Sequence, residues 1–329
     1  MKILYGIQGT GNGHLSRASV LAPYLVQHAE IDFLISGKSS EVQFPYTFKY
    51  RRHGIFFYFG NKGGPEYFKS IASLRPFRFL HDIYALPIEE YDWIISDFEP
   101  ISAWAAKQKK VNCLELSHHA AFRSDAVPRP ESVSRFFEWG MRNFAPGTDS
   151  LGVHYKSYDH NIVTPIIRKS LLKCQTSSEN HVTVYLPAYS DKKLINCFAQ
   201  IKEVNWRIFS KKTDHTYSYG HITIHPVSQK NYNESIISAQ GMILAAGFQA
   251  TSEALYLKKK MLVVPMKAQY EQTCNAVALK RLGVKILADI NEGAVDEIRH
   301  WLNSTQSIES LDFMSHSEII ERVLSILKV

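Results

Sequence analysis

Residues 245–283 read AAGFQATSEALYLKKKMLVVPMKAQYEQTCNAVALKRLG, and they contain the clearest indication of the fold. The apolar run 242–246 predicts a buried strand and Gly247 marks a turn. The Thr-Ser-Glu sequence at 251–253 predicts a helix start, because hydroxyl and acidic side chains favour helix N-termini. A second buried strand at 261–265 leads to a second helix. This order predicts a parallel α/β sheet, and the helix N-terminus after the glycine turn suits a diphosphate.

Carboxylate and amide side chains follow both predicted strands. Glu253 lies inside the first helix, where a carboxylate can accept hydrogen bonds from a ribose diol. Glu271 and Asn275 are four residues apart, and Gln272 and Asn275 are three apart, so the three share one helix face that can grip sugar hydroxyls. Alternatively, Glu253 is an ordinary carboxylate of a first helical turn, and the other three form a solvated helix face.

In this order the residues resemble the donor-binding signature of GT-B glycosyltransferases. That signature is a G-x-x-x-x-x-E turn and helix, followed after a buried strand ending in proline by E/D-Q-x-x-N-A, and residues 247–253 and 271–276 match it. The resemblance implies that residues 248–251 lie against the donor diphosphate and that Glu253 holds the ribose. It implies that the polar helix face meets the transferred sugar or its phosphates. The implied donor-binding residues are Gly247, Phe248, Gln249, Ala250, Thr251, Ser252, Glu253, Glu271, Gln272 and Asn275.

The same resemblance implies a co-substrate and an activity. It favours a UDP-sugar, with the uracil base near Pro226 and Val227, and no separate cofactor. The activity is then glycosyl transfer of the hexosyltransferase class. The acceptor, whether a glycan, a lipid-linked sugar or a small molecule, is not predicted, and neither is the oligomeric state.

A second glycine-rich turn lies near the N-terminus. The predicted strand 2–7 is followed by Gly-Thr-Gly-Asn-Gly-His at 9–14 and by an amphipathic helix to about Gln27. A G-x-G-x-G turn alone could cradle a dinucleotide, but that fingerprint needs G-x-x-G spacing, and His14 stands where it would continue. A helix N-terminus keeps a histidine neutral and able to accept a proton, so we predict His14 as the general base. Alternatively, His14 caps the helix.

Several further residues are predicted around this base. Asp97 directly follows a predicted buried strand at 93–96 and could orient His14 or contact the acceptor; alternatively it caps the helix that follows. Asp97 and Glu99 look like the D-x-D metal pair of the other large transferase fold, but that fold lacks the donor signature, so we expect no metal. The residues expected on the acceptor side are Gly11, Asn12, Gly13, Arg17, Glu99, His118 and His119.

These residues predict direct displacement at the anomeric carbon. His14 takes the proton of the acceptor hydroxyl while the diphosphate leaves toward the helix N-terminus after Gly247. An epimerase of the same fold is an alternative, and it would need more carboxylates in the cleft than Asp97, Glu99 and Glu253 provide. A non-catalytic nucleotide-sugar-binding protein would keep Glu253 but need no base.

Strands and helices alternate along the whole chain, which predicts an α/β protein of the GT-B type, with two doubly wound Rossmann-like domains facing a central cleft. We expect an acceptor-binding domain at 1–165 and a donor-binding domain at 180–305. Between them the pattern breaks at Thr164-Pro165, and residues 175–178 form a polar linker. By resemblance, the C-terminal helix, 316–329, packs back on the first domain.

Composition agrees with two cores in a reducing compartment. The 329 residues are 45% hydrophobic, and the four cysteines lack C-x-x-C spacing, so neither disulfides nor a metal site is expected. With no signal peptide and no long apolar run, we expect a cytoplasmic protein.

The net charge of +7 suits nucleic acid, an anionic membrane or a diphosphate, but no nucleic-acid module is recognisable. Basic and aromatic residues interleave at 48–79, which suits docking on the inner face of a membrane or, alternatively, an ordinary core with solvated charges.

Overall fold

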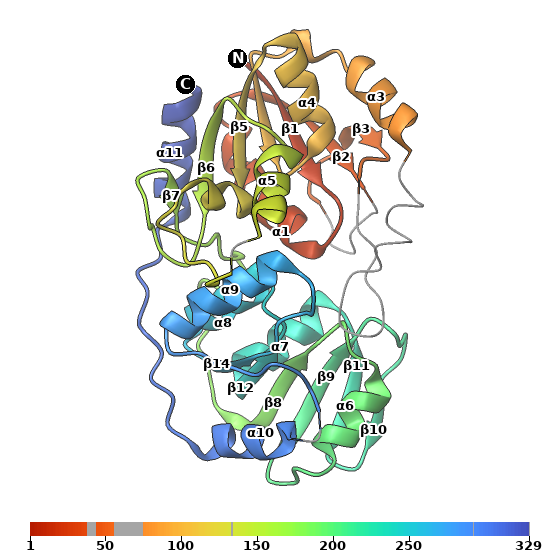
Figure 1. The fold of residues 1–329 in the computed structure, drawn as a ribbon, viewed down its shortest axis with the longest axis vertical. Helices are drawn as coiled ribbons and strands as arrows, with labels where there is room; N and C mark the ends of the chain where they lie inside the picture. The colour runs from red at the N-terminus through yellow and green to blue at the C-terminus, as the bar shows by residue number, and fades with distance from the viewer. Residues whose placement is uncertain (38–43, 56–74, 133, 292, 329) are drawn as a thin grey trace.

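The computed structural model describes residues 1–37, 44–55, 75–132, 134–291 and 293–328. Within these ranges the chain forms two seven-stranded sheets, one above the other, each flanked by helices (Figure 1). The buried strands are apolar on both faces, because helices cover both sides of each sheet.

The first sheet has the order β3-β2-β1-β4-β5-β6-β7, and its neighbouring strands are parallel. Its strands are β1 (Lys2–Gln8), β2 (Glu30–Ser36), β3 (Phe48–Arg52), β4 (Trp93–Asp97), β5 (Asn112–Ser117), β6 (Asp149–Val153) and β7 (Ile162–Val163). The helices of this half are α1 (Asn12–Leu25), α3 (Pro76–Tyr84), η1 (Ile88–Glu90), α4 (Pro100–Lys109), η2 (His119–Arg123) and α5 (Arg135–Phe144).

The second sheet has the order β10-β11-β9-β8-β12-β13-β14, with only its edge strand β10 antiparallel to its neighbour. Its strands are β8 (Glu179–Tyr185), β9 (Asn205–Ser210), β10 (Tyr217–Tyr219), β11 (Ile222–Pro226), β12 (Ala239–Leu244), β13 (Lys260–Val263) and β14 (Lys285–Ile286). Its helices are α6 (Asp191–Phe198), α7 (Gln229–Ser238), α8 (Phe248–Tyr256), α9 (Tyr270–Arg281) and α10 (Ala294–Asn303).

The last helix, α11 (His316–Leu327), returns to the first sheet, where it lies beside β6 and β7 (Figure 1). Its apolar face buries Ile319, Ile320 and Val323 in the core that α1 also covers. A capping box at Ser315 fixes its start. The chain therefore crosses between the halves twice.

Both sheets reverse their strand order next to their first strand. In the first sheet β1 lies between β2 and β4, and in the second β8 lies between β9 and β12. In open parallel sheets ligands bind beyond the carboxyl ends of strands at such reversal points. Helices α8 and α9 of the second sheet face α1 and α5 of the first (Figure 1), so the site lies between the halves.

Most predicted elements are present, with shifted ends. The sequence pattern predicts a helix over 67–86, and in the structure α3 begins at Pro76, while residues 67–74 lie outside the described residues. The pattern also predicts a strand over 48–59, and β3 ends at Arg52, while residues 56–59 likewise lie outside the described residues. Much of the basic and aromatic stretch 48–79 is therefore not described. The short strands β7 and β10 were missed, since strands of two or three residues carry no periodic pattern.

Candidate active site

His14, Arg17 and Asp97 meet at the reversal point of the first sheet. Because β1 and β4 are neighbours, the turn after β1 and the end of β4 reach the same edge. The Nδ1 atom of His14 lies 2.7 Å from Oδ1 of Asp97. Arg17, one helical turn further along α1, donates to both carboxylate oxygens, with its Nε 2.8 Å from Oδ2. Asp97 is fully buried between the histidine and the arginine.

The charges of this cluster favour a neutral histidine beside an ionised carboxylate. Burial alone would raise the pKa of Asp97, but Arg17 and His14 outweigh it, so the pKa is lowered. Burial also lowers the pKa of His14 below its ordinary value, although Asp97 opposes the shift. Near neutral pH the Nδ1–H of His14 therefore donates to Asp97, and Nε2 is left able to accept a proton.

Two helix N-termini without side-chain caps face each other beside this cluster. Gly11 precedes α1 and Gly247 precedes α8, and neither helix has a side-chain cap. A Cβ atom added to either glycine would meet nothing within 4 Å, so the backbone there is open to a ligand. A Cβ on Gly13 would lie 3.7 Å from that of Gln249, so the two turns approach closely. Together they make an electropositive position suited to a phosphate group.

Glu99 has a structural role in place of the predicted acceptor-side one. Its carboxylate accepts from the backbone N–H groups of Ile101 and Ser102 at 2.9 and 2.7 Å, and Ser36 Oγ donates to it at 2.5 Å. It is therefore Glu99, and not Asp97, that caps α4. Glu99 is predicted on the acceptor side, and the structure places it fully buried at the start of α4. Sequence preference misled here, since Asp is the stronger capping residue.

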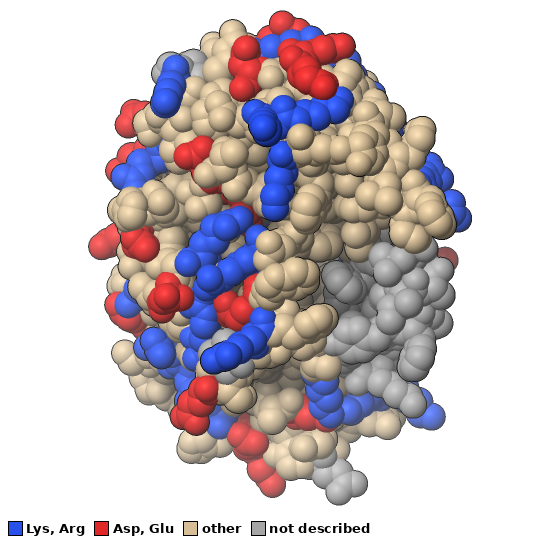
Figure 2. Space-filling view, turned by 45° about the horizontal axis from the view of Figure 1, so that its top comes forward, with Lys and Arg blue, Asp and Glu red and all other residues tan. Residues whose placement is uncertain are grey.

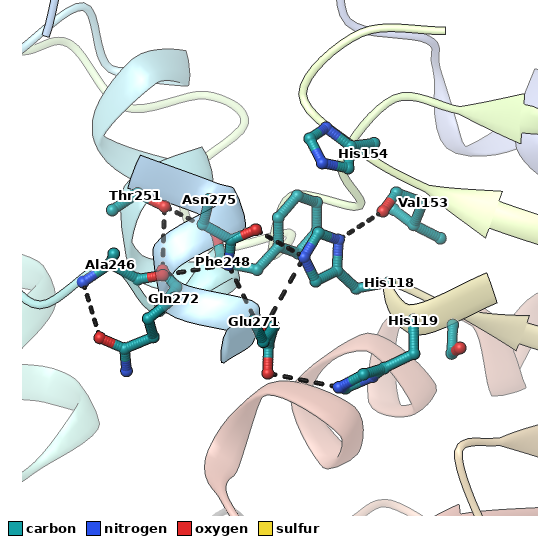
Figure 3. Close-up of polar contacts among 12 residues, drawn as sticks. His118, His119, Val153, His154, Ala246, Phe248, Thr251, Glu271, Gln272 and Asn275 are labelled. Atoms are coloured by element: carbon teal, nitrogen blue, oxygen red, sulfur yellow. Dashed lines mark hydrogen bonds and ion pairs between the residues drawn. The ribbon is translucent and has the colours of Figure 1, made fainter. Parts of the chain in front are cut away.

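The two histidines that follow β5 reach across to the second sheet (Figure 3). The Nε2 atom of His118 lies 2.8 Å from Oδ1 of Asn275, and its ring stacks on Phe248 with 3.8 Å between centroids. His119 Nε2 lies 3.3 Å from a carboxylate oxygen of Glu271. His118 is predicted on the acceptor side; in the structure it is 2% exposed and lies against Asn275 and Phe248 of the second domain. We name His118, His119, Phe248, Glu271 and Asn275 the interdomain clasp.

The amide side chains of α9 hold the backbone before Gly247. Gln272 Oε1 accepts from the N–H groups of Ala246 and Met266 at 3.1 and 2.9 Å. Asn275 Nδ2 donates to the carbonyl of Ala246 at 3.0 Å. Gln272 and Asn275 are predicted to bind the sugar, and in the structure both hydrogen-bond to the backbone of Ala246, before the turn at Gly247 (Figure 3). Glu271 alone of the three keeps a side chain that is 21% exposed.

The ribose-binding carboxylate implied by the resemblance already has partners. Glu253 accepts two hydrogen bonds from Arg168, each 2.6 Å long, and one from Gln249 Nε2 at 2.9 Å. Gln249 Nε2 also lies 3.3 Å from the carbonyl of Ile166, so its side chain points to the linker. The sequence did not indicate that Arg168 would contact Glu253, because Arg168 is a single basic residue in a linker and belongs to no motif.

The other predicted donor residues lie along the first turns of α8, which begins at Phe248 and not at Thr251. Thr251 Oγ1 lies 2.7 Å from the hydroxyl of Tyr155 in the first domain. Ser252 is buried, and its Oγ has no hydrogen-bond partner among the described residues. Ala250 is half-buried. Pro226 and Val227, predicted to meet the base, lie half-buried at the end of β11.

Over the described part of the chain, no three His, Cys, Asp or Glu side chains are grouped to hold a metal ion. All four cysteines are free thiols. Asp97 and Glu99 have different partners, His14 and Arg17 for the first and the N-terminus of α4 for the second. They do not converge as a D-x-D metal pair would.

The family that carries this arrangement is identified by comparison. The glycosyl transferase family 1 pattern matches residues 1–305, nearly the whole chain. The chain belongs to glycosyl transferase family 1. It is a glycosyltransferase, as the donor signature predicted. No curated protein sequence matches this glycosyltransferase.

Solved structures share its fold at low sequence identity. MurG of Acinetobacter baumannii gives a TM-score of 0.59 at 13% identity, over 99% of this chain and 99% of that one. UGT89C1 of Arabidopsis thaliana in complex with quercetin gives 0.59 at 10% identity, over 100% and 99%. A structure of UGT89C1 with UDP gives 0.55 at 12% identity, over 100% and 94%. The likeness confirms the predicted GT-B fold of two Rossmann-like domains.

Proposed function

We propose that this glycosyltransferase moves a sugar from a nucleoside diphosphate, UDP in the first instance, to an acceptor hydroxyl by direct displacement without a metal. The observation that carries the proposal is the hydrogen bond between His14 and Asp97 at the mouth of two uncapped helix N-termini. A general base and an anion position then border the same part of the cleft, and such a displacement uses both.

In the proposed step His14 Nε2 takes the proton of the acceptor hydroxyl as its oxygen bonds to the anomeric carbon. The bond from that carbon to the diphosphate oxygen breaks, and the nucleoside diphosphate leaves with the electron pair. Asp97 accepts from Nδ1–H throughout and stabilises the imidazolium that forms. Arg17 holds Asp97 ionised and in place, which makes it a positioning residue.

The developing charge on the leaving group would be stabilised by backbone N–H groups. In α8 the first helical hydrogen bond runs from the N–H of Thr251 to the carbonyl of Gly247, so helix bonding leaves the N–H groups before Thr251 unpaired, and the turn before α1 approaches them closely. The fold relative UGT89C1 is solved with UDP, which supports a uridine nucleotide here. The acceptor would enter from the first domain near His119, whose ring stacks on Phe98 at 3.6 Å.

Two other readings are weaker. An epimerase would need several carboxylates around the sugar, and Glu99 is withdrawn from the cleft as a helix cap. A non-catalytic nucleotide-sugar-binding protein would have no use for a buried carboxylate that orients a histidine. A transferase uses both groups.

The direct test is release of UDP from UDP-glucose and UDP-N-acetylglucosamine by the purified protein, with and without EDTA. We expect slow hydrolysis in the absence of acceptor that EDTA leaves unchanged. Activity that disappears with EDTA and returns with a divalent cation would overturn the metal-independent mechanism. Product in which the donor sugar is inverted at another carbon would establish the epimerase.

A membrane-bound acceptor is favoured by the surface of the first domain, so we include contact with an anionic membrane in the proposal. Among the described residues, six of the nine exposed large hydrophobic side chains lie on α3 and α5. They are Phe77, Leu80, Tyr84, Phe136, Phe137 and Trp139, and we call them the aromatic face. Phe77, Phe136 and Trp139 are 87%, 73% and 65% exposed.

The charge around the aromatic face suits anionic lipid. Arg78 on α3 and Arg142 on α5 are 53% and 41% exposed, and each also lies within 4.0 Å of a carboxylate on its own helix, Asp82 and Glu138. Figure 2 shows a band of Lys and Arg side chains left of centre in that view, with Asp and Glu side chains among them. Exposed aromatic rings next to basic side chains are typical of proteins that lie on a membrane surface. Within the described residues no helix has the length and apolar character needed to cross a bilayer.

A further inference from the structure

The carboxylate of Glu253 is held by an arginine from the linker between the two sheets. Arg168 follows β7 and donates through Nε and an Nη atom to the two oxygens of Glu253, each at 2.6 Å. Both side chains are largely buried, with exposed fractions of 13% and 2%. A bidentate arginine and carboxylate pair is among the strongest hydrogen-bonded contacts in proteins.

With this pair formed, Glu253 cannot also hold a ribose diol. An ionised carboxylate offers about four acceptor positions. Arg168 uses two of them and Gln249 uses a third. Two adjacent ribose hydroxyls need two acceptor positions, so at least one existing contact must break before the diol binds.

We propose that Arg168 is a placeholder for the donor ribose: it occupies Glu253 in the free enzyme, and the nucleotide takes Glu253 over by exchange. The inference rests on the proposed function, because it takes the donor site to be at α8. Until the donor arrives, the pair with Arg168 keeps the Glu253 carboxylate in a fixed orientation. The pair also lowers the apparent affinity of the enzyme for the nucleotide. While Arg168 occupies Glu253 the ribose cannot bind, so the apparent affinity is the intrinsic affinity multiplied by the fraction of molecules in which the pair is open.

The surroundings indicate that only side chains move in this exchange. Ile166, Ile167 and Leu171 on either side of Arg168 are buried in the core. The carbonyl of Ile167 also accepts from His316 Nε2 at 2.8 Å, which fixes the linker to α11. The backbone at Arg168 is thus anchored, and its guanidinium swings away from a fixed point.

Uridine tests the inference, because it carries the ribose diol but no phosphate with which a positive charge could interact. Its affinity is measured by titration for the wild type, Arg168→Ala and Arg168→Gln, with UDP titrated in parallel. Lys169→Ala is the matched control, since it removes a positive charge from the same linker while its ammonium lies over Tyr24 and away from Glu253. Thermal unfolding checks that each variant is folded.

We expect both Arg168 variants to bind uridine about tenfold more tightly than the wild type, and Lys169→Ala to bind it unchanged. Arg168→Gln keeps an amide beside Glu253, so it reports the effect even if Arg168→Ala does not fold. Folded variants that bind uridine as weakly as the wild type, or more weakly, would overturn the exchange. If the wild type binds neither uridine nor UDP, it is the proposed donor site that fails.

Discussion

Among individual residues, Asp97 and Glu99 do different work although only one residue separates them. Asp97 holds His14, and Glu99 caps α4. We therefore expect Asp97→Asn to lower donor turnover about 10²- to 10⁴-fold, because the histidine loses the partner that selects its tautomer. UDP binding, measured by titration, should be kept.

Glu99→Gln is the matched control for Asp97→Asn, since it removes one buried carboxylate charge nearby. It should lower the melting temperature through the weakened cap and leave turnover near that of the wild type. Equal loss of turnover in both variants would contradict the division of roles.

The pH dependence of turnover is a second prediction for His14. Its pKa lies below 6.5, mainly because it is buried, and the base must be neutral to accept a proton. The neutral form exists above the pKa, so kcat/KM for donor hydrolysis should be constant near neutral pH and fall on the acid side with an apparent pKa below 6.5. A falling limb centred above that value would point to another base.

The sequence indicated which residues carry chemical groups suited to catalysis, but it indicated less well which residues they contact. His14 and Asp97 follow adjacent strands, so their meeting could be expected from the pattern. Glu99 and Arg168 could not be placed, because a capping bond depends on local backbone angles and an ion pair on contacts across the fold. Phe98 between the two carboxylates has a φ of 54°, a left-handed turn that a phenylalanine gives no reason to expect.

Among the helices, α8 shows that the sequence pattern predicts the presence of a helix better than its first residue. The hydroxyl and acidic residues at 251–253 indicated a start there, yet the helix begins at Phe248 after Gly247. Gly247 supplies no side-chain cap, and the hydroxyl and acidic residues that indicated a helix start therefore lie inside the helix. Without a capping side chain, the N–H groups at the start of α8 stay open for a ligand.

The aromatic face on α3 and α5 yields a prediction for membrane binding. Phe136→Ser with Trp139→Gln should weaken binding to vesicles of phosphatidylcholine and phosphatidylglycerol about tenfold or more, because each side chain contributes about 1.5 kcal/mol on burial. Co-sedimentation measures it. Tyr219→Ser, which removes an exposed ring of the second domain, is the control and should bind as the wild type does. Equal binding by all three proteins would contradict a docking role for α5.

In the molecule as a whole, the interdomain clasp joins the two halves and should make stability depend on pH. Burial alone would raise the pKa of Glu271, but His119, His118 and His14 outweigh it and hold the pKa well below its usual range. The unfolded chain takes up this proton near pH 4.3, so the stabilising contribution is present above that pH and is lost as the pH falls below it.

Glu271→Gln should therefore be less stable than the wild type at neutral pH, and the difference should be smaller at about pH 2.5, because the folded chain takes up the proton only well below pH 4.3. Urea unfolding followed by tryptophan fluorescence at both pH values measures it. A difference that stays constant with pH would show that the ionised carboxylate contributes nothing to closure.

The GT-B architecture followed from the sequence because parallel strands buried on both faces read as apolar runs between helices. The contacts across the cleft did not follow from it. The pattern indicates which strand ends face the cleft, but not that Phe248 would stack on His118 or that Thr251 would meet Tyr155. Such contacts depend on how two domains are placed, which no local pattern encodes.

We propose that donor binding and sugar transfer depend on different residues of this enzyme, and measuring both activities in the same variants tests this division. UDP-sugar binding and turnover are measured side by side for the wild type, His14→Ala and Glu253→Ala. We expect Glu253→Ala to lose donor binding, while His14→Ala binds the donor as the wild type does and loses only turnover. A His14→Ala enzyme that turns over at the wild-type rate, or a wild type that binds no UDP-sugar, would contradict it.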